Sequence, residues 1–335
     1  MNTENFVKWQ RNQGHRVIRT ESSFWCEAGP RTFQAFPYHH LIQPTEKELQ
    51  SLMLKHGIMA LRYSLPFEVP TGMVSYHVVL SNPYNLESLG KSARRWIRQG
   101  LKHCVVEPIS FERLAGEGWG LQKDTLDRQC RSSSMNESDW RKLCLSADGL
   151  PGFEAWGALV EGSLAAALLT SRIGDRCYML YSLSLRKFLE ECYANYAIFY
   201  SVSCEMLSRP GINEIFFTVQ SLDAPNSVDE FKFRMAFKAI PIRQRVVFHP
   251  FLQPFIGNTT FRFLDRLTRS YPNNCSLPKA EGMVRFYLQG QLPLEKQEWP
   301  VCLARPAFLD HNDGKSMGSG LAESRIELEH GAVPE

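Results

Sequence analysis

The chain has 335 residues, a net charge of +3 and an apolar fraction of 44%. This length exceeds what one hydrophobic core usually supports, so we expect two domains. The aromatic fraction of 12% excludes a chain that is disordered over most of its length. Because the charge is close to neutral, binding to nucleic acid or to a membrane would have to depend on a local patch.

The cysteines and the N-terminus indicate the compartment. Nine cysteines, an odd number without any C-x-x-C spacing, are typical of a protein that stays reduced. His39 and His40 have no Cys or His at ligand spacing, so we expect no metal site. Residues 1–14 lack the apolar core of a secretory signal, and no apolar run reaches the ~18–20 residues of a membrane span. We therefore expect a soluble, cytoplasmic protein without a membrane span.

The first hundred residues contain a capped helix followed by strands. Thr45 and Glu48 form a capping box, which predicts a helix of about three turns that ends at Gly57. The apolar runs 58–63 and 74–80 predict strands.

A second helix, expected over 84–103, has an apolar stripe and a basic stripe on different faces. The basic stripe contains Lys91, Arg95, Arg98 and Lys102, and few carboxylates lie within four positions of it. This stripe is either a solvated face or a binding surface for an anionic ligand, and the sequence leaves both interpretations open.

The chain changes pattern after residue 104. Glycine turns join three apolar runs into an antiparallel meander, which a long helix follows. The expected elements are a strand at 105–108, helices near 110–131 and from 138, strands at 155–160, 164–172 and 176–184, a helix at 189–207, a strand at 214–220, a helix at 227–237 and a strand at 242–249. We expect domains over 1–103 and 104–300, and a disordered tail over 310–335, where Gly, Ser and charged residues dominate.

Three segments resemble the FemAB-like branch of the GNAT acyltransferase superfamily. They are 57–62 (GIMALR), 92–102 (SARRWIRQGLK) and 230–232 (EFK) with Ala236 and Phe237 behind it. Together they cover about 55–250. The chain departs from the pattern in two places: Ala236 stands where the family has Gly, and the Gly-rich phosphate loop of ordinary GNAT enzymes is missing before Asn195.

The resemblance implies an α/β (α+β) fold: tandem GNAT-like domains with a mixed, largely antiparallel sheet, the N-terminal one reduced. It also implies an N-acyltransferase that moves an acyl group from a thioester donor, acyl-CoA, to an amine of an anionic acceptor by direct attack. No cofactor is expected to be bound permanently. Two alternatives remain open, an aminoacyl-tRNA-dependent transferase and a non-catalytic binding module.

The predicted site combines the resemblance with local patterns. By resemblance, Lys232 stabilises the developing oxyanion, with Phe231 and Asn195 beside it. Arg186 and Lys187 could hold donor phosphates at a helix N-terminus. The expected substrate contacts are Lys91, Arg95, Arg98, Tyr181 and Gln220.

The expected acceptor is a small-molecule or nucleotide-linked anion. A tRNA donor would need a broad basic surface, which 242–269 could supply but which the net charge of +3 does not favour. The basic residues of that stretch are Arg243, Arg245, Arg262, Arg266 and Arg269. The oligomeric state stays open.

Overall fold

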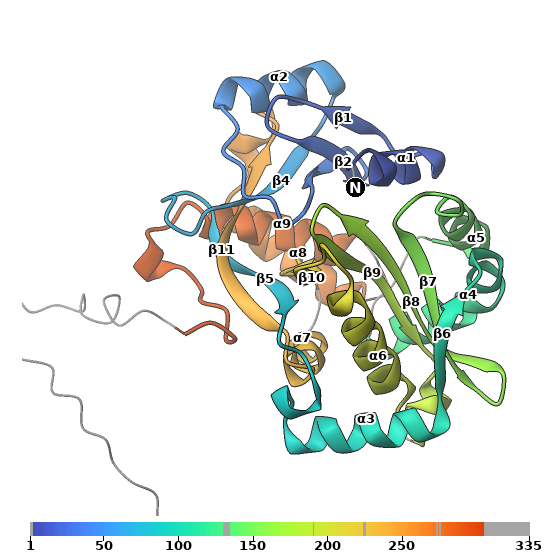
Figure 1. The fold of residues 1–335 in the computed structure, drawn as a ribbon. Helices are drawn as coiled ribbons and strands as arrows, with labels where there is room; N and C mark the ends of the chain where they lie inside the picture. The colour runs from blue at the N-terminus through green and yellow to red at the C-terminus, as the bar shows by residue number, and fades with distance from the viewer. Residues whose placement is uncertain are drawn as a thin grey trace, which may run out of the picture. The chain divides into compact units, whose positions relative to one another are not determined.

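The strands of the computed structural model form one mixed sheet (Figure 1). The structure describes residues 3–129, 135–189, 191–223, 226–272, 274 and 276–304, with no side-chain description for 226–228. The predicted tail over 310–335 lies outside the described residues. The strands are β1 Val17–Arg19, β2 Phe24–Gly29, β3 Thr32–Phe36, β4 Ala60–Leu65, β5 Met73–Ser81, β6 Val105–Ile109, β7 Phe153–Val160, β8 Ser163–Ile173, β9 Arg176–Ser184, β10 Glu214–Val219 and β11 Lys238–Phe248.

The helices pack on both faces of this sheet. They are α1 Glu4–Asn12, α2 Glu46–His56, α3 Lys91–His103, α4 Phe111–Arg128, α5 Glu137–Leu145, α6 Ala194–Ser208, α7 Asn226–Arg234, α8 Asn258–Ser270 and α9 Leu277–Gln289. Short 3-10 helices are η1 Leu86–Ser88, η2 Arg186–Phe188, η3 Gln253–Phe255 and η4 Leu294–Lys296. None of the described helices is both long enough and apolar enough to cross a membrane.

Strand order places a late strand among early ones. The order is β1-β2-β3-β4-β11-β5-β10-β9-β8-β7-β6, so β11 is inserted between β4 and β5 and pairs antiparallel with both. Most neighbours are antiparallel, and the described parallel pairs are β3 with β4 and β9 with β10. The predicted fold class, a mixed and largely antiparallel α/β sheet, is confirmed.

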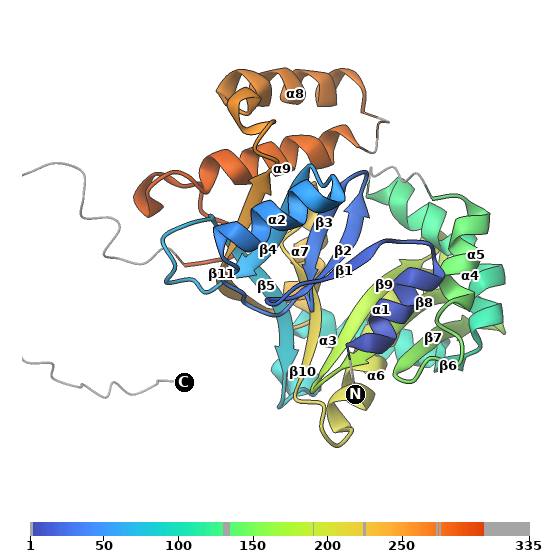
Figure 2. The ribbon, with the colours of Figure 1, turned by 90° about the horizontal axis from the view of Figure 1, so that it is seen from above.

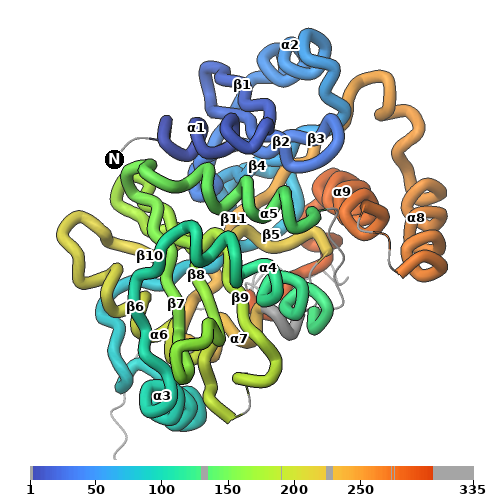
Figure 3. Tube along the Cα trace, turned by 90° about the vertical axis from the view of Figure 1, so that its right-hand side faces the viewer, coloured from blue at the N-terminus to red at the C-terminus, as the bar shows by residue number. Residues whose placement is uncertain are grey.

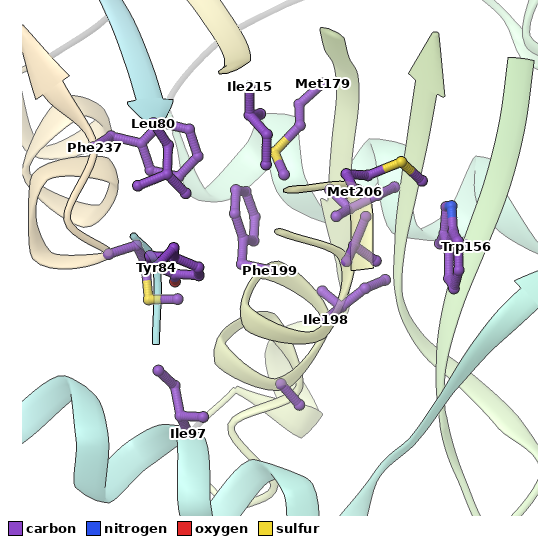
Figure 4. Close-up of a cluster of buried hydrophobic side chains, with 14 of the residues drawn as sticks. Leu80, Tyr84, Ile97, Trp156, Met179, Ile198, Phe199, Met206, Ile215 and Phe237 are labelled. Atoms are coloured by element: carbon purple, nitrogen blue, oxygen red, sulfur yellow. The ribbon is translucent and has the colours of Figure 1, made fainter. Parts of the chain in front are cut away.

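Two hydrophobic clusters lie on the faces of the part of the sheet that contains β5 and β7 to β10. One contains α3, α6 and the end of α7, and the other contains α1, α4 and α5. Figure 4 shows the first cluster, with Ile198 and Phe199 of α6 between Ile97 of α3 and the strand residues Leu80 and Ile215. The two helices approach closely at Gly100, where a Cβ would lie 2.8 Å from the Tyr193 carbonyl oxygen.

A helical pair forms a separate layer. Helix α9 packs on β11 and β5, and α8 packs on α9. Figures 2 and 3 both show α9 between α8 and the sheet.

Most elements predicted after residue 45 are present, with shifted bounds. Two helices begin later than predicted: the first at Lys91 rather than 84, after η1 and Gly90, and α6 at Ala194 rather than 189. Strand β11 begins at Lys238 rather than 242. It tolerates Pro241 because its first residues pair only with β5, and its pairing with β4 begins at Arg243. The predicted division between residues 103 and 104 stays a prediction; the sheet continues across it, and Met1–Ala304 forms one compact unit.

Candidate functional site

A buried ion pair lies on α7. The Lys232 ammonium donates to Oδ1 of Asp229 at 2.6 Å, and these side chains are only 7% and 14% exposed. The ammonium also lies 4.6 Å from the centre of the Phe217 ring of β10. A buried cation requires such partners, because desolvation of an isolated charge is costly. The predicted catalytic lysine is therefore a side chain in a defined environment and not a surface lysine.

The ion pair extends to strand β5. The Tyr76 hydroxyl donates to Oδ2 of Asp229 at 2.5 Å. Burial, the hydrogen bond and the charge of Asp229 all raise the pKa of Tyr76, so this hydroxyl stays protonated and remains a donor. Cys302 is largely exposed as a residue, but its thiol lies near Tyr76, and the partial burial of the thiol raises its pKa. We call Tyr76, Asp229 and Lys232 the lysine cluster.

An aromatic wall fixes α7 against α6. The Phe231 ring lies 5.0 Å from Phe199 and 5.2 Å from Tyr196, both with edge-on geometry. Edge-on aromatic pairs contribute about 0.5–1.5 kcal/mol each beyond their burial. Phe231, predicted to stand beside Lys232, thus has a clear structural role: it holds the turn of α7 from which Lys232 projects.

The chain leaves α7 through a left-handed residue. Ala236 has a φ of 66°, a conformation that glycine adopts at little cost and other residues rarely adopt. This is the position at which the FemAB-like pattern has Gly. A backbone conformation that favours Gly is therefore present at this position, although alanine occupies it.

The two parallel strands beside the cluster separate. Strands β9 and β10 pair only through Arg176–Tyr178 and Glu214–Phe216. Beyond this point β9 continues to Ser184 with a register shift near Leu180, whereas β10 continues in its pairing with β5. Main-chain groups on the separated edges can pair with an extended ligand that contains amide groups.

Helix α6 begins at the same end of the strands. Its N-cap, Tyr193, has a φ of 48° and provides no side-chain cap, and its first turn contains no acidic residue. A helix N-terminus without a cap presents N–H groups that suit an anion. Asn195, in this turn, has a buried Oδ1 atom without a hydrogen-bond partner among the described residues.

The predicted basic stripe is exposed on α3. Lys91, Arg95, Arg98 and Lys102 are all exposed, and among the described residues no carboxylate lies within 4 Å of their charged groups. Trp96 connects α3 to the other site helices.

The Trp96 ring lies 5.1 Å from that of Tyr196 on α6 and 5.4 Å from the guanidinium of Arg234 on α7. Arg234 also donates to the Tyr196 hydroxyl at 3.2 Å. The stripe thus borders the helices that hold the lysine cluster.

Other predicted contacts lie elsewhere. Arg186 and Lys187 are exposed in η2, where the Lys187 ammonium lies 4.5 Å from the centre of the Phe188 ring. Tyr181 packs against Trp140 of α5, on the face of the sheet that α4 and α5 cover. The structure does not bring Tyr181 to the lysine cluster.

Gln220 belongs to a polar network at the junction of four strands. Its Oε1 accepts from Ser75 at 2.8 Å, and its main-chain oxygen accepts from Arg62. Arg62 also donates to Gln244 at 2.5 Å, and burial lowers the pKa of Arg62 to about 10. Because side chains alternate along β5, Ser75 and Tyr76 point to opposite faces, so the Gln220 side chain is separated from the lysine cluster by the sheet.

Several site residues were not predicted. Asp229 stands three positions before Lys232, a spacing that puts both on one helix face, so the pair could have been found in the sequence. Tyr76 is 153 positions from Asp229, and no local pattern connects them. Among the described residues, no three His, Cys, Asp or Glu side chains are grouped to hold a metal ion.

Comparisons with known proteins find solved structures with a similar fold. No family model matches the chain, and no curated protein matches it. FemX matches with a TM-score of 0.50 and 11% identity, over 74% of this chain and 92% of FemX. L-PGS from Bacillus licheniformis matches over 81% and 98%, with a TM-score of 0.47 and 11% identity. A tandem GNAT protein from the clavulanic acid biosynthesis pathway matches over 70% and 82%, with a TM-score of 0.42 and 10% identity.

The likeness to FemX concerns the fold alone, because so few residues are identical. It confirms the resemblance in fold that the three sequence segments predict. The chemistry has to be argued from the lysine cluster and its surroundings.

Proposed function

We propose that the protein is an acyltransferase that moves an acyl group from a thioester donor to an amine of an anionic acceptor. The lysine cluster supports this most directly. It presents a buried, ion-paired ammonium next to the separated ends of β9 and β10, in a fold of the FemX type. A fixed cation in a desolvated site stabilises an oxygen atom that gains negative charge.

The reaction proceeds by direct attack. The amine nitrogen attacks the thioester carbon, and the carbonyl oxygen becomes an oxyanion. The carbonyl then re-forms as the C–S bond breaks, and the leaving sulfur takes up the proton that the nitrogen loses, which gives an amide and a free thiol. An ammonium group has three N–H donors, so its bond to Asp229 is compatible with a bond from Lys232 to the oxyanion. Asp229 and Tyr76 hold the ammonium at one point, which reduces the reorganisation that the reaction requires.

Acyl-CoA is the donor that we favour. The uncapped N-terminus of α6, which follows β9, suits the donor's phosphates, and the separated strand edges suit its amide groups. The unsatisfied Oδ1 of Asn195 can accept from an N–H group of the bound donor. Arg186 and Lys187 lie between β9 and α6 and would add positive charge. A cytoplasmic location, where acyl-CoA is made and used, is part of this proposal.

The basic stripe on α3 would hold the anionic acceptor, since its cations are exposed and border α6 and α7. The alternative tRNA donor receives less support. Of the five arginines expected to form its surface, Arg243 is only 4% exposed and Arg245 is paired with Glu46 at 2.6 Å.

Turnover of Lys232→Met tests the proposal. The purified chain is incubated with a panel of acyl-CoA donors and amine acceptors, and released CoA is measured by chromatography. The substitution should lower kcat by roughly 10²–10³, the effect of losing one oxyanion donor, with a much smaller change in KM. Lys238→Met, which removes an exposed lysine six positions away, is the matched control and should retain activity.

Near-normal turnover by a folded Lys232→Met variant would contradict the catalytic role. Asp229→Asn gives a second measurement. It keeps the shape of the Asp229 side chain and removes the negative charge that pairs with Lys232, so it should also lower kcat. Binding of acyl-CoA by the parent chain without turnover on any acceptor would favour the non-catalytic binding module.

A further inference from the structure

Helix α8 is an outer layer of the molecule. It packs on α9, which separates it from the sheet in two perpendicular views (Figures 2 and 3). Not one of its residues is buried. Its inner side, with Phe261 and Leu264, is partly buried against the cluster formed by α9, β4 and β11. Its outer side therefore faces away from the rest of the fold.

Aromatic side chains are concentrated on and beside this helix. Among the described residues, every exposed Phe, Tyr or Trp lies between 251 and 271. Their exposed fractions are 73% for Phe251, 66% for Phe255, 60% for Phe263 and 60% for Tyr271. The rings of Phe251 and Phe255 lie 6.1 Å apart, so they form a pair at the entrance to the helix. An apolar concentration of this kind marks an interaction surface.

The same outer side is cationic. Arg262, Arg266 and Arg269 are exposed, and their spacing of four and three places them on one helix face, next to Phe263. Asp265 is the only acidic residue of α8, and it pairs with Arg269 at 2.8 Å. No carboxylate of the described residues lies within 4 Å of the Arg262 or Arg266 guanidinium. The face thus combines aromatic rings with unneutralised positive charge.

This combination fits an anionic lipid bilayer. An amphipathic helix lies in the membrane interface when aromatic side chains enter the acyl boundary and Arg side chains meet lipid phosphates. RNA would need a continuous cationic track. The track is interrupted here, since Arg243 is buried and Arg245 is paired with Glu46. We propose that the outer face of α8, with Phe251 and Phe255 before it, docks the protein on anionic lipid.

The proposal does not depend on the acyltransfer reaction. Its surface and the lysine cluster share no residue, and docking can be measured without any acyl donor.

Vesicle flotation tests the proposal with the full chain. Vesicles of phosphatidylcholine, with and without phosphatidylglycerol, are mixed with the protein at low and at high salt. We expect the protein to float with the phosphatidylglycerol vesicles, with affinity on the order of tenfold weaker for phosphatidylcholine alone, and weaker again at high salt.

Two variants separate the apolar and charged contributions. Phe255→Ser with Phe263→Ser should weaken flotation on the order of tenfold at both salt concentrations, because the apolar term is not screened. Arg262→Gln with Arg266→Gln should weaken it by a similar factor at low salt and remove most of its salt dependence. Leu54→Ser, an exposed apolar residue (63%) on α2, is the matched control and should float like the parent chain.

All of these positions are exposed, so the variants should keep the circular dichroism of the parent chain. Absence of flotation of the parent chain on phosphatidylglycerol vesicles would overturn the proposal, as would flotation that neither double variant reduces. Binding to RNA that the arginine variant abolishes and the phenylalanine variant leaves unchanged, without vesicle binding, would assign the face to nucleic acid instead.

Discussion

Gly282 of α9 offers a sharp test of the packing between α9 and the loop that leads to α7. A Cβ at this position would lie 2.5 Å from the carbonyl oxygen of Leu222 and 2.8 Å from its Cβ. Ordinary contact begins near 3.4 Å, so the neighbouring backbone would have to move by about 0.9 Å. That movement is opposed by Arg285, which donates to the same carbonyl at 3.1 Å.

Two opposing effects decide the outcome of Gly282→Ala. Alanine improves helix propensity by about 1 kcal/mol, while overpacking against backbone costs about 3 kcal/mol at the upper end of its usual range. We expect the free energy of unfolding to fall by about 2 kcal/mol. Gly116→Ala is the matched control, because Gly116 is an exposed helical glycine with nothing within 4 Å of its added Cβ. It should raise the same free energy by about 0.5–1 kcal/mol.

Urea unfolding followed by circular dichroism measures both variants. The two substitutions are chemically identical, so opposite signs can come only from their surroundings. A Gly282→Ala protein as stable as the parent chain would refute the reasoning, because the contact with Leu222 would then be loose.

Two further predictions concern charge. Arg95→Ala and Arg98→Ala should weaken binding of an anionic acceptor or inorganic polyphosphate in calorimetry at low salt, and the loss should shrink as salt rises; normal low-salt binding would mean a solvated face. Burial lowers the pKa of His39 to about 2 and that of His77 to about 3, so both stay neutral in the fold and take up protons when it unfolds. The contribution of these two histidines to stability should therefore be constant above pH ~6.5 and fall below it, by up to about 1.4 kcal/mol per pH unit for each histidine. Urea unfolding between pH 7 and pH 5 measures this slope, which His77→Gln should reduce; a flat profile for the parent chain would contradict it.

Local signals in the sequence were sufficient to predict the elements that begin or end at a capping residue or a glycine turn. The helix α2 begins where Thr45 accepts from the Glu48 amide and ends at Gly57 with a φ of 64°, as the capping box predicts. The meander β7–β9 follows from its glycine turns. By contrast, β1 to β3 were not predicted, although each pairs with its neighbour along the chain. These strands have only three to six residues and are separated by turns, so too few positions show a clear alternation.

The site was predicted only in part for the same reason. Lys232 and Phe231 were proposed from the resemblance of one short motif, which the structure places on a single helix, α7. Tyr76 reaches Asp229 only through the pairing of β5 with β10 and β11, which nothing near Tyr76 in the sequence specifies. Tyr181 was assigned to the substrate because strand alternation gives two faces without saying which face the ligand occupies.

The insertion of β11 between β4 and β5 has a consequence for synthesis of the chain on the ribosome. When β4 and β5 emerge, the strand that joins them is more than 150 residues away, because β5 ends at Ser81 and β11 ends at Phe248. At about 5–20 residues per second, both strands wait on the order of 10 to 30 s with unpaired edges. Strand β5 has nine residues and is buried along nearly all its length in the finished fold. Until β11 is made, its unpaired backbone groups can pair with strands of other nascent chains. Chaperone occupancy during translation should therefore be highest in the interval between these two strands.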